Sequence, residues 1–422
     1  MINLNRLRCN DDWSFSDIKR SQSLYASHGY HRYPAKFIPQ LVRKIILQYS
    51  VPKDIVFDPF GGCGTTLVES RLNMRNSIGI DINKVAVLIT KAKIRDVDVD
   101  RLALRNKALL ESIANKVAIY DNKPNFFESA NPRLQYWFKP EQYNRLQLIY
   151  GCILKENDRV IRHFYKCCFS NILKNCSIWY SKSIKPMRDL DKKVEDPIKA
   201  FTRHLNYMTK RNEEFRRIVK MQTPEEYLFC KMRKDDARRI QISDNYVDLV
   251  VTSPPYVTSY EYAELHQLST LWFHFAEDIK EVKRNFIGTE SRKIKRNTLE
   301  SETAKETILE LAYKNKAISR HVSNYYHDML KCFKEIYRVL KPGKYFCLIL
   351  GDTEFLGTKI QNTKVSLEQL KAVGFKHQDI IKRKLSSKIF TPFRDKTGKF
   401  TNSKNGEKRT IYQYEYIIVA KK

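Results

Sequence analysis

A strand that runs into a glycine-rich turn and then a helix is the feature that most constrains this fold. Residues 55–57 are β-branched or aromatic and predict a strand, which the following Asp-Pro pair ends because proline cannot donate to a ladder. Three closely spaced glycines form a tight turn, and residues 65–69 predict the start of a helix. A second strand at residues 77–82 and a second helix at residues 83–93 repeat this order. The alternation predicts a parallel sheet covered by helices.

The pattern changes at about residue 100. From there to about residue 220, helical spacing dominates and strand signals nearly vanish. Strands resume at residues 227–232 and 247–251. We therefore expect residues 1–99 and 226–422 to form one α/β domain, interrupted by a largely helical basic insertion at residues 100–225.

The second part of this domain carries its own signals. A charged stretch of mixed sign at about residues 277–321 predicts a second insertion. A long amphipathic helix over residues 324–340 ends at a Lys-Pro-Gly stop signal. The remaining predictions are a strand at 345–350, a helix at 365–373, and strands at 377–383 and 411–420 that form an edge hairpin.

The chain is strongly basic. Its 77 Lys and Arg residues against 47 Asp and Glu residues leave a formal charge of +30. Between residues 159 and 220 alone there are 16 basic and 6 acidic residues, a net charge of +10. Such an excess favours a polyanionic partner, although a ribosomal or membrane-surface protein could carry it too. We expect the basic residues of the insertion to bind phosphates. Its aromatic residues are expected to lie mostly in its core, and one or two of them could instead be wedges that take the place of a displaced base: Phe164, Tyr165, Trp179 and Tyr180.

Two features bear on location and metals. The chain has no apolar stretch long enough for a transmembrane helix and no apolar core of a secretory signal in residues 1–14. Nine cysteines without secretory features favour reduced thiols in a cytoplasm. Cys152, Cys167, Cys168 and Cys176 lie near His163 but lack the paired spacing of a zinc site. We expect buried thiols there and no metal.

Residues 252–256, Thr-Ser-Pro-Pro-Tyr, are the most informative motif. Two prolines directly after an apolar strand stop the ladder and stiffen the loop. The Ser253 side chain and the Pro254 carbonyl would then be fixed acceptors at the carboxyl end of a strand, where open α/β sheets bind ligands. Two acceptors can take both protons of an exocyclic amine, and Tyr256 can stack on its base. The alternative is a plain strand-ending turn with a packed tyrosine.

The glycine turn lacks the spacing of a dinucleotide site and the lysine of a P-loop. It therefore suits a ligand without a phosphate, or is only a strand-helix turn. Asp81 ends the second strand and could accept hydrogen bonds from ribose hydroxyls, or could be a helix N-cap. Asp236 could accept from the adenine amine of a cofactor, and a capping role is the alternative there as well.

These motifs resemble those of a known family. Asp-Pro-Phe-Gly-Gly-Cys-Gly-Thr-Thr at residues 58–66 resembles motif I of amino-methyltransferases that act on DNA, and residues 252–256 resemble their catalytic motif IV. Residues 31–37, His-Arg-Tyr-Pro-Ala-Lys-Phe, are similar to motif X, which closes over the methionine end of the cofactor. Residues 339–343 resemble a helix-to-strand junction of Rossmann-like methyltransferases. The serine form of motif IV is typical of cytosine-N4 enzymes, whereas adenine-N6 enzymes more often carry an acidic residue or asparagine.

The resemblance implies a Rossmann-like class I methyltransferase with a seven-stranded, mostly parallel sheet whose last strand is antiparallel. It implies S-adenosyl-L-methionine as cofactor, double-stranded DNA as substrate and N4 of cytosine as target, with base flipping and direct methyl transfer. The implied catalytic residues are Ser253, Pro254, Pro255 and Tyr256. The implied cofactor residues are Tyr33, Pro34, Lys36, Phe37, Asp58, Pro59, Phe60, Gly61, Gly62, Gly64, Thr65, Thr66, Asp81, Ile82, Asp236 and Ala237.

The motif order departs from a common pattern, because many serine-type enzymes place the catalytic motif before the glycine motif. The basic insertion is therefore the candidate target-recognition region, and the charged insertion at about residues 277–321 could share or replace that role. No cysteine follows a proline, so a carbon-5 methyltransferase is excluded. The alternatives are an adenine-N6 enzyme, an RNA base methyltransferase and a catalytically dead subunit. We expect a cytoplasmic bacterial or archaeal protein that acts at the nucleoid, in restriction-modification or epigenetic marking, and a cognate restriction endonuclease stays open as a partner.

Overall fold

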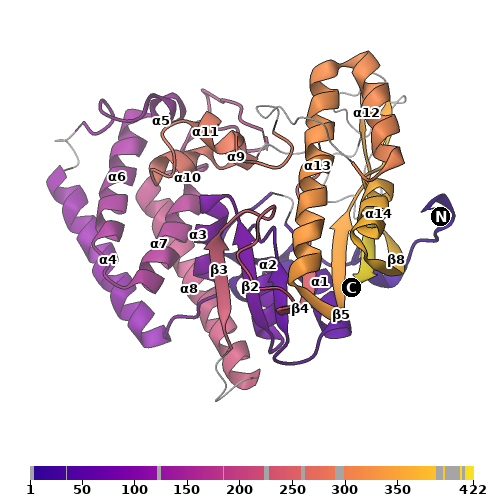
Figure 1. Cartoon of the computed structure of the whole chain (residues 1–422). Helices are drawn as coiled ribbons and strands as arrows, with labels where there is room; N and C mark the ends of the chain where they lie inside the picture. The colour runs from indigo at the N-terminus through magenta and orange to yellow at the C-terminus, as the bar shows by residue number, and fades with distance from the viewer. Residues whose placement is uncertain are drawn as a thin grey trace.

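The computed structural model describes residues 4–34, 36–120, 125–183, 185–222, 228–257, 262–289, 299–385, 393–394, 409–410 and 414–422. Its centre is a seven-stranded sheet of order β3-β2-β1-β4-β5-β11-β8 (Figure 1). β11 is antiparallel to both β5 and β8, and the other neighbouring pairs are parallel. This confirms the predicted fold class and the edge hairpin. The strands are β1 Ile55–Asp58, β2 Asn76–Asp81, β3 Cys230–Lys234, β4 Val247–Thr252, β5 Leu340–Leu350, β8 Lys376–Lys384 and β11 Tyr414–Lys421.

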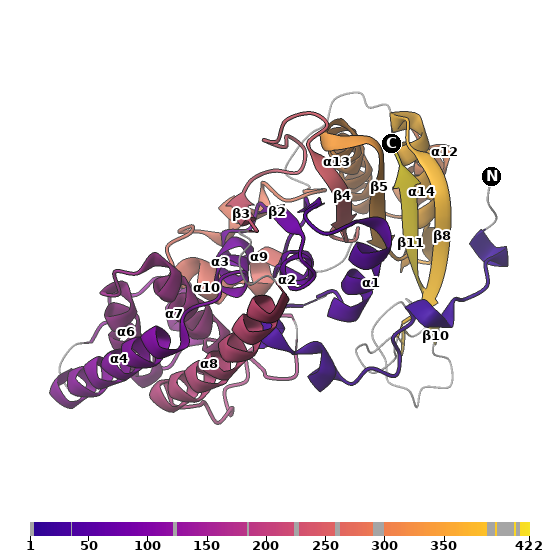
Figure 2. The same ribbon diagram turned by 90° about the horizontal axis from the view of Figure 1, so that it is seen from below.

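Helices cover both faces of the sheet, as Figure 2 shows from below. Successive strand residues point to opposite faces, so neighbours such as Val56 and Phe57 enter different cores. Val56 packs with α1, and Phe57 packs with the core that α13 and α14 complete. A further apolar cluster joins α2 and α3 to β3. These helices are α1 Pro39–Tyr49, α2 Thr65–Leu72, α3 Lys84–Lys93, α13 Lys316–Val339 and α14 Asn362–Val373.

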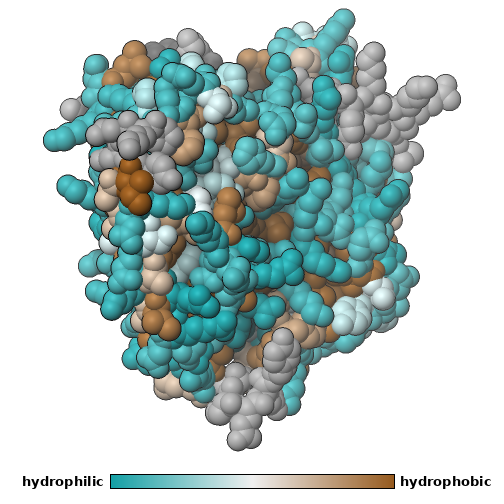
Figure 3. Space-filling model, turned by 90° about the vertical axis from the view of Figure 1, so that its left-hand side faces the viewer, coloured by the Kyte–Doolittle hydropathy of each residue, from teal (hydrophilic) through white to brown (hydrophobic). Residues whose placement is uncertain are grey.

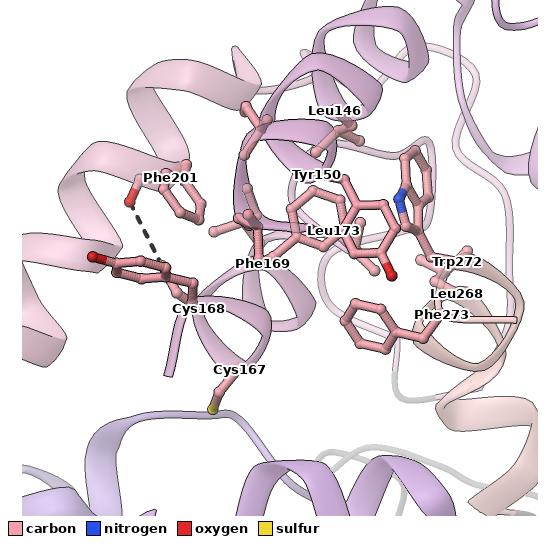
Figure 4. Packing of buried hydrophobic residues seen from close by; sticks show 14 of the residues in the cluster. Leu146, Tyr150, Cys167, Cys168, Phe169, Leu173, Phe201, Leu268, Trp272 and Phe273 are labelled. Carbon is pink, nitrogen blue, oxygen red and sulfur yellow. Dashed lines mark hydrogen bonds between the residues drawn. The ribbon is translucent and has the colours of Figure 1, made fainter. Parts of the chain in front are cut away.

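The basic insertion is helical, and its apolar core continues into α3 and into the helices that follow residues 252–256. Figure 4 shows Phe169 of α7 and Tyr150 of α6 packed with Trp272 and Phe273. The outer face, over α4 and α6, is largely hydrophilic, and its apolar side chains lie in separate spots (Figure 3). The helices are α4 Val99–Tyr120, α5 Pro132–Trp137, α6 Pro140–Leu154, α7 Arg159–Ile172, α8 Pro197–Gln222, α9 Tyr262–Leu265, α10 Gln267–Trp272, α11 Ile279–Lys283 and α12 Glu302–Lys314.

Shorter elements complete the chain. Four 3-10 helices precede α1, and two short antiparallel pairs lie outside the main sheet. The 3-10 helices are η1 Leu4–Arg6, η2 Asp11–Trp13, η3 Arg20–Ser23 and η4 Ala26–Gly29. The short strands are β6 Thr353–Phe355, β7 Thr358–Ile360, β9 Phe393–Arg394 and β10 Arg409–Thr410.

Several predicted boundaries are wrong. The strand predicted at 227–232 is β3, which begins at Cys230, and residue 227 lies outside the described part. The helix predicted from residue 324 begins at Lys316, because the Asn315 side chain caps it by accepting from two backbone N–H groups. The helix predicted from residue 365 begins at Asn362. The last strand, predicted from residue 411, is described from Tyr414 on, and residues 411–413 lie outside the described part.

The Lys-Pro-Gly stop ends the helix but opens no separate loop. β5 begins at Leu340, which already pairs with Val247, and an irregularity in register precedes the pairing of Leu249 with Tyr345. β5 therefore includes Pro342 and begins before residue 345, where the strand was predicted to start. A proline is tolerated at such an irregular strand end because no ladder hydrogen bond has to be donated there.

The cysteine cluster is part of the insertion core. Cys152, Cys167, Cys168 and Cys176 are buried, as expected, and all nine cysteines are free. Burial raises the pKa of the Cys167 thiol to about 12 and lowers that of His163 to about 4. Phe164, Tyr165 and Trp179 are likewise buried, so these three are core and not exposed wedges. None of the helices in the described ranges is long and apolar enough to cross a membrane.

The buried face of α13 allows a test of how this helix packs against the sheet. Phe333 is fully buried against the sheet, with its ring centroid 6.1 Å from that of Phe346. Phe333→Ala should lower the free energy of unfolding by roughly 3–5 kcal/mol, measured by urea titration. Tyr313→Ala on α12 is the control, because Tyr313 is 92% exposed. Equal unfolding midpoints for the two variants would contradict this packing.

Candidate functional site

The glycine turn after β1 has a backbone conformation that other residues rarely adopt. Gly61 donates its N–H to the Ile80 carbonyl over 2.9 Å, which ties the turn to β2. Gly62 and Gly64 have positive φ angles of 48° and 78°. A Cβ on Gly64 would lie 2.6 Å from Cγ2 of Thr90. The turn therefore needs glycine for its conformation and, at Gly64, for its packing, and it lies at the carboxyl end of the sheet.

Asp81 ends β2 beside this turn. Its Oδ2 accepts from the Gly62 N–H over 2.9 Å, and its Oδ1 accepts from the Asn83 N–H over 2.8 Å. Burial raises the pKa of Asp81 to about 6. The N-cap of α3 is Asn83, whose side chain accepts from Val85 N–H, so the capping alternative for Asp81 is wrong. A carboxylate with two bonds made still has lone pairs for the hydroxyls of a ligand.

A buried hydrogen bond joins the glycine turn to the Thr-Ser-Pro-Pro-Tyr loop. Thr252, the last residue of β4, donates from Oγ1 to Asp58 Oδ1 over 2.6 Å. The same carboxylate oxygen accepts from the Phe60 N–H over 3.0 Å. Burial raises the pKa of Asp58 to about 6. The carboxyl ends of β1 and β4 are thus held together, with both loops on the same edge of the sheet.

The loop itself presents its residues at this edge. Pro254 is buried, whereas Ser253, Pro255 and Tyr256 are half-buried. The Tyr256 hydroxyl donates to Glu415 Oε1 on β11 over 2.9 Å. A Cβ on Gly351 would lie 3.7 Å from Cε2 of Tyr256, so the tyrosine ring packs against that glycine after β5. Residues 258–261 lie outside the described part of the chain.

The segment similar to motif X reaches the glycine turn. Cε1 of Tyr33 is 3.6 Å from the position of a Cβ on Gly62. The Tyr33 ring lies 4.9 Å from that of His266 and stacks on Tyr262 with centroids 6.1 Å apart. His266 is buried, and its Nδ1 is 2.9 Å from Nδ2 of Asn83. The structure therefore brings Tyr33 to the same place as Asp81 and the turn.

The neighbours of Tyr33 in that segment lie deeper. The Lys36 ammonium donates to the His28 carbonyl over 3.1 Å, and burial next to Lys93 lowers the pKa of Lys36 to about 8. Phe37 packs with the core under α1. Pro34 is half-buried, and Ala35 lies outside the described residues.

Asp236 and its neighbour occupy the end of β3. The Asp236 carboxylate holds the Arg238 backbone N–H over 3.0 Å and its guanidinium over 2.6 Å, and that guanidinium also pairs with Asp328. Asp236 therefore already carries an ion pair where an acceptor for an adenine amine was expected. Ala237 is buried among apolar residues of one sheet face, and Ile82, after β2, is half-buried.

Sequence patterns missed four residues at this edge. Lys93 is fully buried and donates to the Cys63 carbonyl over 2.7 Å, which supports the glycine turn from below. Asn83 and His266 flank Tyr33, and Glu415 holds Tyr256. No spacing in the sequence links Glu415 to a loop 159 residues earlier. An asparagine directly after Asp81 and Ile82 was a readable N-cap signal.

The donor set fits a nucleoside ligand without phosphates. The glycine turn, the Asp81 carboxylate and the Tyr33 ring lie together, and the buried Nε2 of His266 has no hydrogen-bond partner among the described residues. Thr65 and Thr66 are buried in the first turn of α2, below the glycines, and Pro59 is buried behind them. Within the described ranges no group of three potential metal ligands occurs.

Comparisons with known sequences point to one protein family. The sequence model of the DNA methylase family, which covers N6 and N4 enzymes, matches residues 3–92 and 247–422. The type II methyltransferase M.MvaI from Kocuria varians is 26% identical over 418 residues, 94% of this chain and 92% of the relative. M.BsoBI from Geobacillus stearothermophilus is 24% identical over 83% of this chain and 78% of its own length.

Solved structures include a putative DNA modification methylase from Thermus thermophilus in complex with S-adenosyl-L-methionine. It is 17% identical over 44% of this chain and 53% of that chain, with a TM-score of 0.22. A methyltransferase from Methanosarcina mazei covers 93% of this chain and 98% of its own at 11% identity and a TM-score of 0.30. The family match leaves out residues 93–246, which hold all of the basic insertion. The chain belongs to the DNA methylase family of amino-methyltransferases, which methylate DNA with S-adenosylmethionine as cofactor.

Proposed function

We propose that this enzyme methylates N4 of cytosine in double-stranded DNA at a specific site. The observation that carries the choice of base is Ser253, which stands in the catalytic loop where adenine-N6 enzymes more often have an acidic residue or asparagine. Ser253 is held at the carboxyl end of β4, next to the glycine turn, by the Thr252–Asp58 hydrogen bond. A neutral hydroxyl and a proline carbonyl are two acceptors for the two protons of a cytosine amine.

The reaction in this proposal is a direct transfer. The target cytosine leaves the duplex and enters the loop, where Tyr256 stacks on its ring. Ser253 Oγ and the Pro254 carbonyl accept the amine protons, which directs the nitrogen lone pair at the methyl group. S-adenosylmethionine supplies that methyl group on a positively charged sulfur. The N–C bond forms as the C–S bond breaks, and the nitrogen then loses one proton to solvent.

Rate acceleration here comes mainly from positioning. Bringing the amine and the methyl donor into line converts a bimolecular step into an effectively unimolecular one. The two loops that would hold them are joined by the 2.6 Å bond between Thr252 and Asp58. The distance between the two loops is thus fixed by the sheet before substrate binds.

The cofactor is proposed to lie on the glycine turn. Gly61, Gly62 and Gly64 would let it approach the backbone, Asp81 would accept from its ribose hydroxyls, and Tyr33 would cover it. Phe37 packs under α1, and Asp236 carries the ion pair with Arg238. The other residues proposed for the cofactor site are Asp58, Pro59, Phe60, Thr65, Thr66, Ile82, Pro34, Lys36, Phe37, Asp236 and Ala237.

The basic insertion is proposed to recognise the target. Tyr136 of α5 is 42% exposed, and two guanidinium groups lie near its ring. The guanidinium carbon of Arg188 is 4.2 Å from its ring centroid, and that of Arg133 is 5.1 Å away. Arg133 also donates to Gln267 Oε1 of α10 over 2.8 Å, and α10 follows the catalytic loop. Exposed arginines around an aromatic ring suit contacts to DNA phosphates and bases.

The biological setting is proposed from the relatives, which are named type II methyltransferases. In this setting the enzyme protects a site that a cognate restriction endonuclease cuts. The charged insertion, which includes α11 and α12, would then assist recognition or only cover the sheet.

Nucleoside mass spectrometry tests the proposed base. DNA and RNA are incubated with the enzyme and methyl-labelled cofactor, digested and analysed. We expect label in N4-methylcytosine from DNA, and a loss of at least about a hundredfold in rate for Ser253→Ala, because one of two positioned acceptors is gone. N6-methyladenine, or label in RNA alone, would contradict the assignment, and so would full activity of Ser253→Ala.

Salt dependence of duplex binding tests the recognition surface. Arg188→Ala should weaken binding and reduce the slope of log K against log salt by about 1, because one phosphate contact is lost. Arg217→Ala is the matched control, since Arg217 is an exposed arginine of the same insertion near the end of α8, away from the loop (Figure 1). Equal slopes for the two variants would contradict the proposed surface.

A further inference from the structure

A buried ion pair behind the catalytic loop has no part in the reaction described so far. Arg383 of β8 donates to Glu415 Oε2 of β11 through Nε over 3.0 Å and through Nη2 over 2.8 Å. The two side chains are only 3% and 16% exposed. The remaining nitrogen, Nη1, donates to the backbone carbonyls of Trp13 over 3.1 Å and Ser14 over 3.4 Å. Each nitrogen of the guanidinium is therefore engaged, and its orientation is fixed.

Stability alone is a poor reason for such a pair. Removing two charges from water is expensive, and well-packed apolar residues often replace a buried ion pair without loss of stability. The pair joins β8, the edge strand, to its neighbour β11. A functional role for the ion pair is indicated by the other contact of Glu415.

The free oxygen of Glu415 contacts the catalytic loop. Oε1 accepts from the Tyr256 hydroxyl over 2.9 Å. A carboxylate paired with arginine can only accept hydrogen bonds, so the phenol must donate its single hydrogen to Glu415. Burial and the neighbouring Glu415 raise the pKa of Tyr256 well above its usual range, so the phenol keeps that hydrogen.

The direction of the hydrogen bond from Tyr256 to Glu415 determines the direction of the hydrogen bond between Ser253 and Tyr256. Because its hydrogen points to Glu415, the Tyr256 oxygen can only accept from its other neighbours. The Ser253 side chain hydrogen-bonds this phenol and lowers its pKa, opposing the larger effect of burial. The serine hydrogen then points to Tyr256, and the serine lone pairs are left for an incoming amine. Gly351 backs the Tyr256 ring, so the phenol position is set from both ends.

We propose that Glu415, held by Arg383, is a positioning residue that orients Tyr256 and thereby makes Ser253 a hydrogen-bond acceptor for the target amine. The inference rests on the proposed roles of Ser253 and Tyr256. It adds a residue from the last strand to the machinery for base binding. The N-terminal segment also contributes to this arrangement, because the carbonyls of Trp13 and Ser14 fix the orientation of the Arg383 guanidinium.

The test is a double-mutant cycle in steady-state methylation. Glu415→Gln keeps the shape but puts an amide, which can donate, beside the phenol, and Tyr256→Phe removes only the hydroxyl. Each should lower kcat by about tenfold to a hundredfold, because a misoriented acceptor misplaces the amine. The double variant should be no slower than Tyr256→Phe alone, since both act through one bond. The KM for the cofactor should stay within about twofold in all three, because the network touches only the base side of the site.

Asp248→Asn is the matched control. Asp248 is a 9% exposed carboxylate in the same sheet, paired with Lys341 over 2.8 Å at the amino end of β4. It should change stability and leave kcat unaltered. If Glu415→Gln resembles this control in kcat, or if the two single effects multiply in the double variant, the positioning role is overturned. If Glu415→Gln does not fold, Tyr256→Phe decides, and full activity of that variant overturns the proposal.

Failure of this inference is distinguishable from failure of the proposed function. In the first case the wild-type enzyme still forms N4-methylcytosine and still needs Ser253, but Glu415→Gln leaves kcat unchanged. In the second case no N4-methylcytosine forms in wild type.

Discussion

The hydrogen bond from Thr252 to Asp58 is the contact on which the site depends. It joins the ends of two neighbouring parallel strands, one leading to the glycine turn and the other to the Ser-Pro-Pro-Tyr loop. Both partners are buried, so breaking the bond would remove one of the hydrogen bonds that compensate the buried Asp58 carboxylate. Because the bond sits in the core, the distance between the two loops is set by the fold. A reaction that works by alignment needs this kind of rigid support.

The N-terminal segment before β1 closes the site at two places. Tyr33 lies on the glycine turn and contacts His266, a residue that follows the Thr-Ser-Pro-Pro-Tyr loop. Farther back, the carbonyls of Trp13 and Ser14 hold Arg383, which holds Glu415 and through it Tyr256. The segment also anchors the insertion, because His31 contacts Ser170 of α7 over 2.9 Å. One stretch of chain thus links the glycine turn, the Thr-Ser-Pro-Pro-Tyr loop and the basic helices.

Sequence reasoning succeeded where the physics is local. The strand before the glycine turn, the turn and the helix after it follow from β-branched residues, proline and glycine, and the structure has them at Ile55–Asp58 and from Thr65. The fold class followed from the alternation of elements and from the resemblance. Boundaries failed where a cap or a register decided them, as at Asn315 and Leu340. Glu415 and His266 could not be found, because their partners are distant in sequence and only the closed sheet brings them together. The alternative of a capping role for Asp81 failed because Asn83 takes it.

The central claim is that one edge of the sheet holds two adjoining subsites, with the cofactor on the glycine turn and the amine on the serine loop. Isothermal titration calorimetry of S-adenosylmethionine with wild type, Asp81→Ala and Ser253→Ala separates these subsites directly. The account predicts that Asp81→Ala weakens binding by at least about tenfold, equal to about 1.4 kcal/mol. Ser253→Ala should bind the cofactor within about twofold of wild type, since its hydroxyl faces the base. Unchanged affinity in Asp81→Ala, or an equal loss in Ser253→Ala, would contradict the division of the site.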